Sequence, residues 1–292
     1  MAKKTKKHLL LVDGENILHQ SFHKFANLKS KEGKPSGAIF GFFKSLHYYV
    51  NRFNPDNIGV TFDNGHSKER LKLLENYKGH RKNIAIDYSS LQSQKRVILR
   101  MLKYLGISHI FDKSKDILYE GDDYLAWMAL NVPKGVKVTI ISSDKDFNQL
   151  ISKDIKIFNP RKDEIINRHN CKDIFGYSPE QTVSYLALVG DSSDDIPGVK
   201  GIGPVKAKAI LDNYGDVPNA LKNNCPDKDK IAPVWKKNQF LIDLRFYLEK
   251  FPLKYKDLPL IEKLPNLDRF IKLAKKYSLN SFQTDMFLKT FY

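Results

Sequence analysis

Five short apolar segments alternate with segments of helical periodicity along the first part of the chain. The apolar segments are residues 8–12, 57–62, 107–111, 137–142 and 155–158. Because strands that alternate with helices form parallel sheets with right-handed crossovers, this order restricts the fold more than any other feature of the sequence. It predicts an α/β domain whose central, mostly parallel sheet is flanked by helices, with the fifth strand at an edge.

Acidic residues stand where these strands would end or where the next helix would begin. They are Asp13, Asp63, Glu120, Asp122, Asp123, Asp144 and Asp146. The functional crevice of a parallel sheet lies beyond the carboxyl ends of its strands, so we expect these side chains to converge there. Acids in a first helical turn also cap the helix, but three acids within residues 120–123 exceed what one cap needs.

Converging carboxylates repel one another by on the order of several kcal/mol in a partly buried site, so they need cations. Ligands made only of oxygen, with no Cys or His at ligand spacing, favour Mg²⁺ or Mn²⁺ over Zn²⁺. Two such ions roughly 4 Å apart can clamp the attacking and leaving oxygens of a phosphodiester, while one of them activates the water. These acids therefore predict a metal-dependent phosphodiester hydrolase.

Residues 190–207 combine two further acids with a glycine turn. Asp191 and Asp194 lie three residues apart and would complete the metal site, and Gly201 and Gly203 precede a helix predicted from about residue 205 to 213. The backbone N–H groups at a helix start can bind a phosphate, and Lys200 and Lys206 add positive charge nearby. We predict a helix-hairpin-helix over residues 186–213 that binds the duplex backbone without reading sequence; the alternative is a plain helical connection with solvated lysines.

The chain carries a formal net charge of +16, which indicates a polyanion as its partner. Between residues 64 and 100, cations are interleaved with aromatic residues, a composition typical of elements that hold single strands. We predict a mobile basic arch over about residues 66–100; a solvated helix face is the alternative. The residues concerned are Lys68, Arg70, Lys72, Tyr77, Lys78, His80, Arg81, Lys82, Lys95, Arg96 and Arg100.

Helical periodicity without strand signals follows the glycine turn, which predicts an α/β domain over residues 1–176 and a helical DNA-binding domain over 177–292. We expect helices at 205–213, 217–222, 232–248 and 267–277, and a last helix at 279–292 that packs back onto the body. Two cysteines far apart imply neither a disulfide framework nor a zinc site, and no apolar run is long enough for a membrane span. A cytoplasmic protein is expected.

Six motifs together resemble a known family. They are Leu11-Val12-Asp13-Gly14, Phe62-Asp63, Tyr77-Lys78-Gly79-His80-Arg81, Glu120-Gly121-Asp122-Asp123, Ser143-Asp144-Lys145-Asp146 and residues 190–203, and they stand in the family's order. The chain is similar to the structure-specific 5′ nucleases, the 5′-3′ exonuclease and flap endonuclease group found free in bacteriophages and as the N-terminal part of bacterial DNA polymerase I.

This resemblance implies a nuclease that removes 5′ flaps and RNA primers near the junction of single and double strand. It implies nine metal ligands, the seven acids above with Asp191 and Asp194, that hold Mg²⁺, with Mn²⁺ as a substitute. Lys78 and Arg81 match catalytic cations at the base of the helical arch, Arg70 matches a further arginine there, and Tyr77 matches an aromatic that stacks on a terminal base.

The resemblance also implies that residues 198–203 form a helix-three-turn-helix, whose carbonyls often hold K⁺ beside the DNA. A monomeric, phage-encoded enzyme of the host cytoplasm is expected, acting on branched, 5′-flapped or RNA-primed DNA, with a replicative polymerase or a single-strand-binding protein as partner.

Two positions depart from the family pattern. Asp195 stands where the family usually has Asn, and Gln20 stands where polymerase-linked members often carry Arg. The alternatives are a non-catalytic scaffold for DNA junctions and a ribonuclease of RNA:DNA hybrids that uses the same site. A phosphatase of the phosphoaspartyl type would need a second Asp two residues after Asp13, where Glu15 stands.

Overall fold

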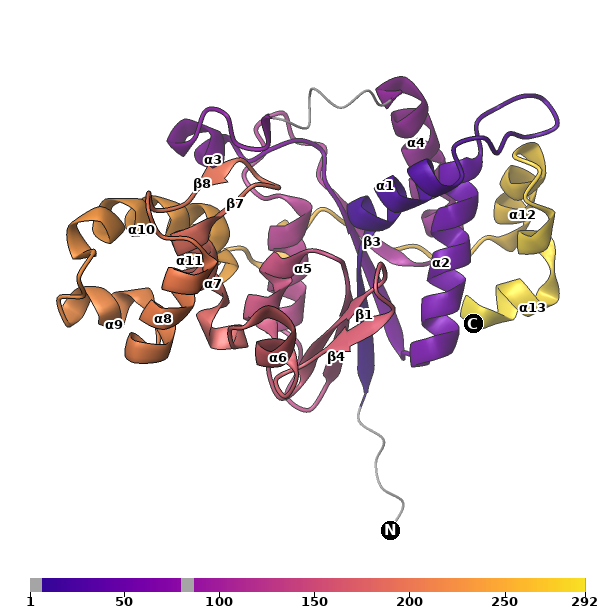
Figure 1. Ribbon diagram of the computed structural model, residues 1–292. Helices are drawn as coiled ribbons and strands as arrows, with labels where there is room; N and C mark the ends of the chain where they lie inside the picture. Colours follow the sequence, from indigo (N-terminus) through magenta and orange to yellow (C-terminus); the bar gives the residue numbers. More distant parts are fainter. Residues whose placement is uncertain (1–6, 80–86, 292) are drawn as a thin grey trace, which may run out of the picture.

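The computed structural model describes residues 7–79 and 87–291, and its centre is a seven-stranded sheet with the strand order β6-β5-β4-β1-β2-β3-β9 (Figure 1). The strands are β1 (His8–Asp13), β2 (Asn57–Phe62), β3 (Ser108–Phe111), β4 (Lys137–Ile141), β5 (Ile155–Asn159), β6 (Glu164–Ile166) and β9 (Leu260–Ile261). The strands β1 to β5 pair in parallel, whereas β6 and β9 pair antiparallel with their neighbours. The predicted mostly parallel sheet is therefore confirmed.

The edges of the sheet differ from the prediction. β5 is not an edge strand, because the chain turns back after residue 159 and β6 pairs antiparallel with it. The other edge is covered by β9, which comes from a segment near the end of the chain and pairs with β3. Sequence periodicity has no signal for either pairing, since both added strands are only two or three residues long.

One face of the sheet is covered by α1 (Gly14–Lys24), α2 (Gly37–Phe53) and α4 (Tyr88–Tyr104) (Figure 1). The helix α2 buries the side chains of Phe42 and Phe43 completely. Glycine allows α1 and α2 to pack closely, because a Cβ at Gly41 would lie 2.6 Å from the side chain of Ser21. The other face is covered by α5 (Gly121–Leu130) together with the turn Lys145–Leu150.

The second body of the molecule consists of short helices with their own apolar core. They are α7 (Thr182–Val189), α8 (Pro204–Tyr214), α9 (Val217–Lys222), α10 (Lys228–Ile242) and α11 (Leu244–Lys250). The single helix predicted for residues 232–248 is in fact two helices, because the backbone of Asp243 is extended and its carboxylate caps α11. Between α7 and α8, a short ribbon of β7 (Gly190–Asp191) and β8 (Ile196–Pro197) precedes the glycine turn.

The end of the chain returns to the α/β domain, as expected, but not as one helix. It consists of α12 (Leu267–Lys276), α13 (Asp285–Leu288) and short 3-10 turns at Asn280–Gln283 and Lys289–Phe291. Phe270 and Phe287 pack against α2 in the main core. The predicted boundary assigns residues 260–291 to the helical domain, whereas sheet pairing and packing join them to the α/β domain.

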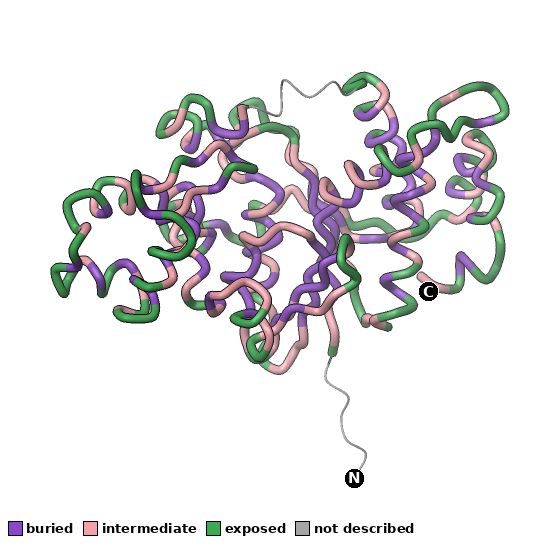
Figure 2. Tube along the Cα trace, in the orientation of Figure 1, coloured by how far each residue is buried: buried purple, intermediate pink, exposed green. Residues whose placement is uncertain are grey.

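Buried residues run along the sheet and the inner sides of the helices, while the outer sides are exposed (Figure 2). The predicted arch has α3 (Lys68–Leu73) and α4 on its two sides, and its middle lies outside the described residues. Within residues 7–79 and 87–291, no helix has both the length and the apolar composition to cross a membrane. Cys171 and Cys225 are buried and free.

Packing of the last helix gives a stability prediction. Phe287→Ala should lower the free energy of unfolding by about 3–5 kcal/mol, because it opens a cavity beside Phe282 and His47. The adjacent Met286 is 77% exposed, so Met286→Ala is the matched control and should change the free energy by no more than about 0.5 kcal/mol. Urea denaturation followed by circular dichroism measures both, and equal losses would contradict this packing.

Candidate active site

Two neighbouring parallel strands deliver the first pair of acids. Asp13 ends β1, caps α1 through the N–H of Asn16 at 2.9 Å, and accepts a hydrogen bond from the hydroxyl of Ser142 at 2.7 Å. Ser142 follows β4 and its oxygen also accepts the N–H of Asp144 at 3.0 Å. One serine hydroxyl thus joins Asp13 and Asp144 across the ends of two strands, as parallel pairing predicts.

The next strand adds Asp63 and positions α5. Asp63 follows β2, and its Oδ1 accepts the backbone N–H of Gly121 at 2.6 Å. A Cβ at Gly121 would lie 2.8 Å from that oxygen, so glycine permits this approach. Asp122, the next residue of α5, faces a cleft of about 680 Å³ that Asp13, Asp63 and Asp144 also line.

The last acids come from the turn after β4 and from the second body. Asp146 lies in the 3-10 turn, while Asp191 and Asp194 come from β7 and the turn after it. Asp191 is 1% exposed, and its Oδ1 accepts hydrogen bonds from Ser193 and pairs with Lys145 Nζ at 3.1 Å. Burial alone would raise the pKa of Asp191, but the Ser193 bonds and the Lys145 charge outweigh it and lower the pKa.

Most of the remaining carboxyl groups have raised pKa values. For Asp13, burial and then the charges of Asp63 and Asp144 raise the pKa to about 7. Burial is also the largest cause for Asp63, Asp122, Asp144 and Asp146, and the charges of neighbouring acids add to it in each case. The cleft therefore holds carboxylates that resist ionisation unless a cation compensates them.

The donor set fits a hard divalent cation. Among the described residues, Asp146 Oδ1 and Asp191 Oδ2 are buried oxygens without a hydrogen-bond partner, which is costly unless a cation binds there. In the same part of the chain, no three carboxylate, imidazole or thiolate side chains form a complete ligand set for one ion. Mg²⁺ commonly binds through one or two carboxylates with waters and substrate phosphates, so an incomplete protein set is compatible with it.

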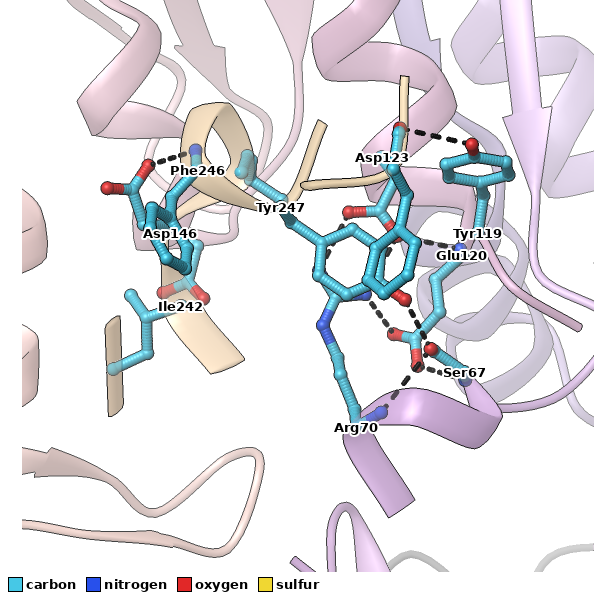
Figure 3. Close-up of polar contacts among 12 residues, drawn as sticks. Ser67, Arg70, Tyr119, Glu120, Asp123, Asp146, Ile242, Phe246 and Tyr247 are labelled. Atoms are coloured by element: carbon cyan, nitrogen blue, oxygen red, sulfur yellow. Dashed lines mark hydrogen bonds and ion pairs between the residues drawn. The ribbon is translucent and has the colours of Figure 1, made fainter. Parts of the chain in front are cut away.

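Two predicted site residues bind each other instead of a ligand. The guanidinium of Arg70 forms two bonds of 2.7 Å with the carboxylate of Asp123 and lies 4.0 Å from the centre of the Tyr247 ring (Figure 3). Arg70 is 2% exposed and Asp123 is fully buried. The pair anchors α3 to α5 in this structure, and the DNA contact expected for Arg70 and the metal-ligand role expected for Asp123 stay predictions.

Lys78 and Tyr77 lie beside this pair. Lys78 Nζ is 2.6 Å from Glu120 Oε2 and 3.7 Å from Asp194 Oδ2, and the residue is 2% exposed. Burial alone would raise the pKa of Glu120, but the charges of Lys78 and Arg70 lower it to about 2. The Glu120 carboxylate therefore lies against Lys78 and does not line the cleft of about 680 Å³. The hydroxyl of Tyr77 lies 3.3 Å from Glu120, and its ring is buried, so the predicted stacking on a terminal base is not available.

The predicted hairpin is present as a turn between α7 and α8 with an exposed helix start. Lys200, Gly201, Gly203 and Lys206 are all exposed, and Lys206 pairs with Asp227 at 2.6 Å. A Cβ at either glycine would meet nothing within 4 Å, so the backbone there is open to a large ligand. Arg81, the remaining predicted catalytic residue, lies outside the described residues.

Several residues that line or support the cleft are not among the predicted site residues. Ser142 and Asn16 bond directly to the acid-bearing segments, and Glu15 faces the cleft beside Lys95. Lys95 is counted with the arch in the sequence, but it is 3% exposed. In the sequence, Ser142 stands two residues before Asp144 and Glu15 two residues after Asp13, and these spacings are the signals that could have indicated them.

Fold and site together define an α/β protein with an acidic cleft at its strand ends, joined to a helix-hairpin-helix body. The family model for the 5′-3′ exonuclease N-terminal resolvase-like domain matches residues 8–176, and that for the C-terminal SAM fold matches residues 177–275. The chain belongs to the 5′-3′ exonuclease family. The resemblance found in the sequence, and with it the assignment as a 5′ nuclease, is confirmed.

Individual relatives agree with this assignment. A 5′-3′ exonuclease of Aquifex aeolicus is 36% identical over 218 residues, which are 74% of this chain and 73% of the relative. A 5′-3′ exonuclease of Buchnera aphidicola is 30% identical and covers 94% of both chains. The solved T5 5′-exonuclease shares the fold, with a TM-score of 0.67 at 21% identity over 98% of this chain and 100% of that one.

The raised pKa values predict how the metal-free protein responds to pH. A carboxyl whose pKa is higher in the folded than in the unfolded state stabilises the fold at low pH and loses this contribution as the pH rises through the folded value. In EDTA, the melting temperature should therefore fall between about pH 4, near the ordinary pKa of an Asp carboxyl, and about pH 7. Asp13→Asn should flatten this fall, because the pKa of Asp13 is about 7; an unchanged slope would contradict the shift.

Proposed function

We propose that this protein is a Mg²⁺-dependent, structure-specific 5′ nuclease that hydrolyses phosphodiesters near junctions of single and double strand. It acts as a flap endonuclease and 5′-3′ exonuclease in DNA replication, where RNA primers and flaps are removed. The observation that carries the proposal is the pair of buried, unbonded oxygens of Asp146 and Asp191, residues that are hydrogen-bonded neighbours of the cleft residues Asp144 and Ser193.

Seven of the nine expected carboxylates are proposed as metal ligands. Glu120 and Asp123 are left out because they pair with Lys78 and Arg70. The seven are Asp13, Asp63, Asp122, Asp144, Asp146, Asp191 and Asp194. These carboxylates would hold two Mg²⁺ ions, for which Mn²⁺ should substitute. The bound ions would neutralise the carboxylate charges and activate a water for attack on the phosphorus. Hydrogen bonds from Ser142, Gly121 and Ser193 hold three of these carboxylates, those of Asp13, Asp63 and Asp191, in fixed positions.

Lys78 is the cation best placed to act on the reacting phosphate. Its backbone has a φ of +55°, and its N–H donates to the carbonyl of Asp194 at 3.0 Å, so its position is fixed by the second body. An ammonium held among carboxylates stays protonated: burial alone would lower the pKa of Lys78, but the charges of Glu120, Asp194 and Asp122 raise it well above its usual value. It can stabilise charge that develops on the phosphate. Arg81 is expected to assist from the adjoining segment.

The second body would hold the duplex. The exposed start of α8, with Gly201, Gly203, Lys200 and Lys206, offers N–H groups and charge to a backbone phosphate. Carbonyls of this turn would hold K⁺ beside the DNA. A solved T5 D15 flap endonuclease that shares this fold, with a TM-score of 0.65 at 21% identity, is a complex with DNA and metal ions. Branched, 5′-flapped or RNA-primed DNA is the proposed substrate.

The protein is proposed to act as a monomer that meets a replicative polymerase or a single-strand-binding protein. A non-catalytic junction scaffold is disfavoured, because the candidate ligands that line the cleft, Asp13, Asp63, Asp122 and Asp144, repel one another and destabilise a fold that only binds DNA. Hydrolysis of RNA:DNA hybrids would use the same residues and forms an arm of the test.

The test is cleavage of a 5′-labelled, 5′-flapped duplex in Mg²⁺ and in EDTA, beside a single strand, a blunt duplex and an RNA:DNA hybrid. The proposal expects Mg²⁺-dependent release of a product that ends near the junction. Tight binding of the flapped duplex without cleavage in Mg²⁺ or Mn²⁺ would make the protein a junction scaffold.

Asp146→Asn should abolish cleavage but leave binding of the flapped duplex close to wild type, and Asp144→Asn should behave in the same way. Each loses a carboxylate charge needed to hold the metal ions, whereas the duplex contacts lie on the second body. Single-turnover cleavage and fluorescence anisotropy measure the two properties. Cleavage at the wild-type rate by either variant would refute the two-metal assignment.

Lys78→Ala should slow single-turnover cleavage by about 10²–10³-fold, the range for loss of one group that stabilises the transition state. Its effect on affinity should be much smaller, because Lys78 is buried and cannot be a main contact for the bound strand. Equal losses in rate and affinity would make Lys78 a phosphate anchor. Lys134, an exposed residue of the loop before β4, provides the control Lys134→Ala.

A further inference from the structure

A buried lysine lies in the wall of the acidic cleft. Lys95 is in the middle of α4 and is 3% exposed, although the sequence places it among the cations of a solvent-facing arch. Its ammonium lies 5.2 Å from the centre of the Phe111 ring and 5.7 Å from that of Phe62. A lysine charge is rarely buried unless it is paired, so its partners indicate its role.

The first partner is Glu15, at 2.6 Å from Lys95 Nζ. Glu15 is the second residue of α1, its side chain is 20% exposed, and it lines the cleft with Asp13 and Asp63. A second basic group, His19 Nε2, lies 3.5 Å from the Glu15 carboxylate, so Lys95 is the nearer of the two basic partners of this acid on the cleft wall.

The second partner is the backbone carbonyl of Asp63, which accepts a hydrogen bond from the same ammonium. The carboxylate of Asp63 is held at its other side by the N–H of Gly121. Glu15 and Asp63 both line the cleft, and the same ammonium bonds to both residues. Lys95 therefore connects α4 to both the backbone that presents Asp63 and the acid that repels it.

We propose that Lys95 is a positioning residue of the nuclease, which fixes Asp63 through its carbonyl and cancels the charge that Glu15 would present to DNA in the cleft. The inference rests on the proposed function, because it concerns the metal and the DNA of the same cleft. Lys95 lines the cleft, but it is 3% exposed and its ammonium is already bonded to two acceptors, so the proposal assigns it no substrate contact.

The first test measures metal binding without catalysis, through the rise in melting temperature that increasing Mn²⁺ produces. Lys95→Met keeps the length of the side chain and removes its charge and donors. It should raise the Mn²⁺ concentration at half of the rise by about 10- to 100-fold, the range for loss of a group that orients a metal ligand. An unchanged concentration overturns the positioning of Asp63.

The second test separates the charge role by steady-state cleavage of the 5′-flapped duplex. Lys95→Met should raise KM several-fold, because Glu15 is left uncompensated beside the DNA. The double variant Lys95→Met/Glu15→Gln removes that charge as well, so its KM should return close to wild type while its Mn²⁺ requirement stays raised. A KM that remains as high as in the single variant overturns the charge role.

The double variant also guards against a folding failure, since it buries no unpaired charge. Lys103→Met makes the same substitution at an exposed position of α4 and should alter neither the Mn²⁺ requirement nor KM. If wild type binds Mn²⁺ but does not cut the flapped duplex, the proposed function fails, and the Mn²⁺ titration still decides whether Lys95 positions Asp63.

Discussion

Mutual repulsion among buried carboxylates is the constraint on which the rest of this structure depends. The strands deliver acids to one edge of the sheet, and burial removes the water that would screen them. Four cations from separate segments counter this charge: Lys78 on Glu120, Lys95 on Glu15, Lys145 on Asp191 and Arg70 on Asp123. Each pair joins two segments that are distant in sequence, so charge compensation also holds the site together.

Part of the chain's positive charge is buried beside the acids and does not lie on the surface. A net charge of +16 indicates a surface for nucleic acid, yet some of the cations nearest the cleft are buried and bonded to acids. Arg70, Lys78 and Lys95 are each at most 3% exposed. Their positions set the geometry of the acids, while Lys200 and Lys206 are exposed on the second body.

The sequence predicted the parts of the fold that rest on long periodic segments. The strand 57–62 has the predicted bounds and the helix predicted at 267–277 is α12 (Leu267–Lys276), because each has a clear apolar pattern and a clear end. The edge strands β6 and β9 were not predictable, because a two- or three-residue strand is defined by its neighbour and not by its own composition. The break at Asp243 depends on a local cap that interrupts an otherwise continuous helical pattern.

The candidate site was predictable to the same extent. Strand ends placed Asp13, Asp63 and Asp144 together without any three-dimensional information. Periodicity cannot tell which acid of a pair faces the cleft, so Asp122 and Asp123 looked equivalent although one lines it and the other binds Arg70. The role of Lys95 was hidden for a similar reason, because a cation within a basic stretch gives no sign that its helix turns it inward.

The position of β9 has a consequence for how the chain is made. This strand and the helices α12 and α13 complete the edge and the outer side of the N-terminal domain, yet they follow every helix of the second body in the sequence. During synthesis, the edge of β3 and the apolar side of α2 stay uncovered until nearly the whole chain has left the ribosome. The helices α7 to α10 pack against near neighbours in sequence and can fold before that point. The domain that is synthesised first is therefore the last to be completed.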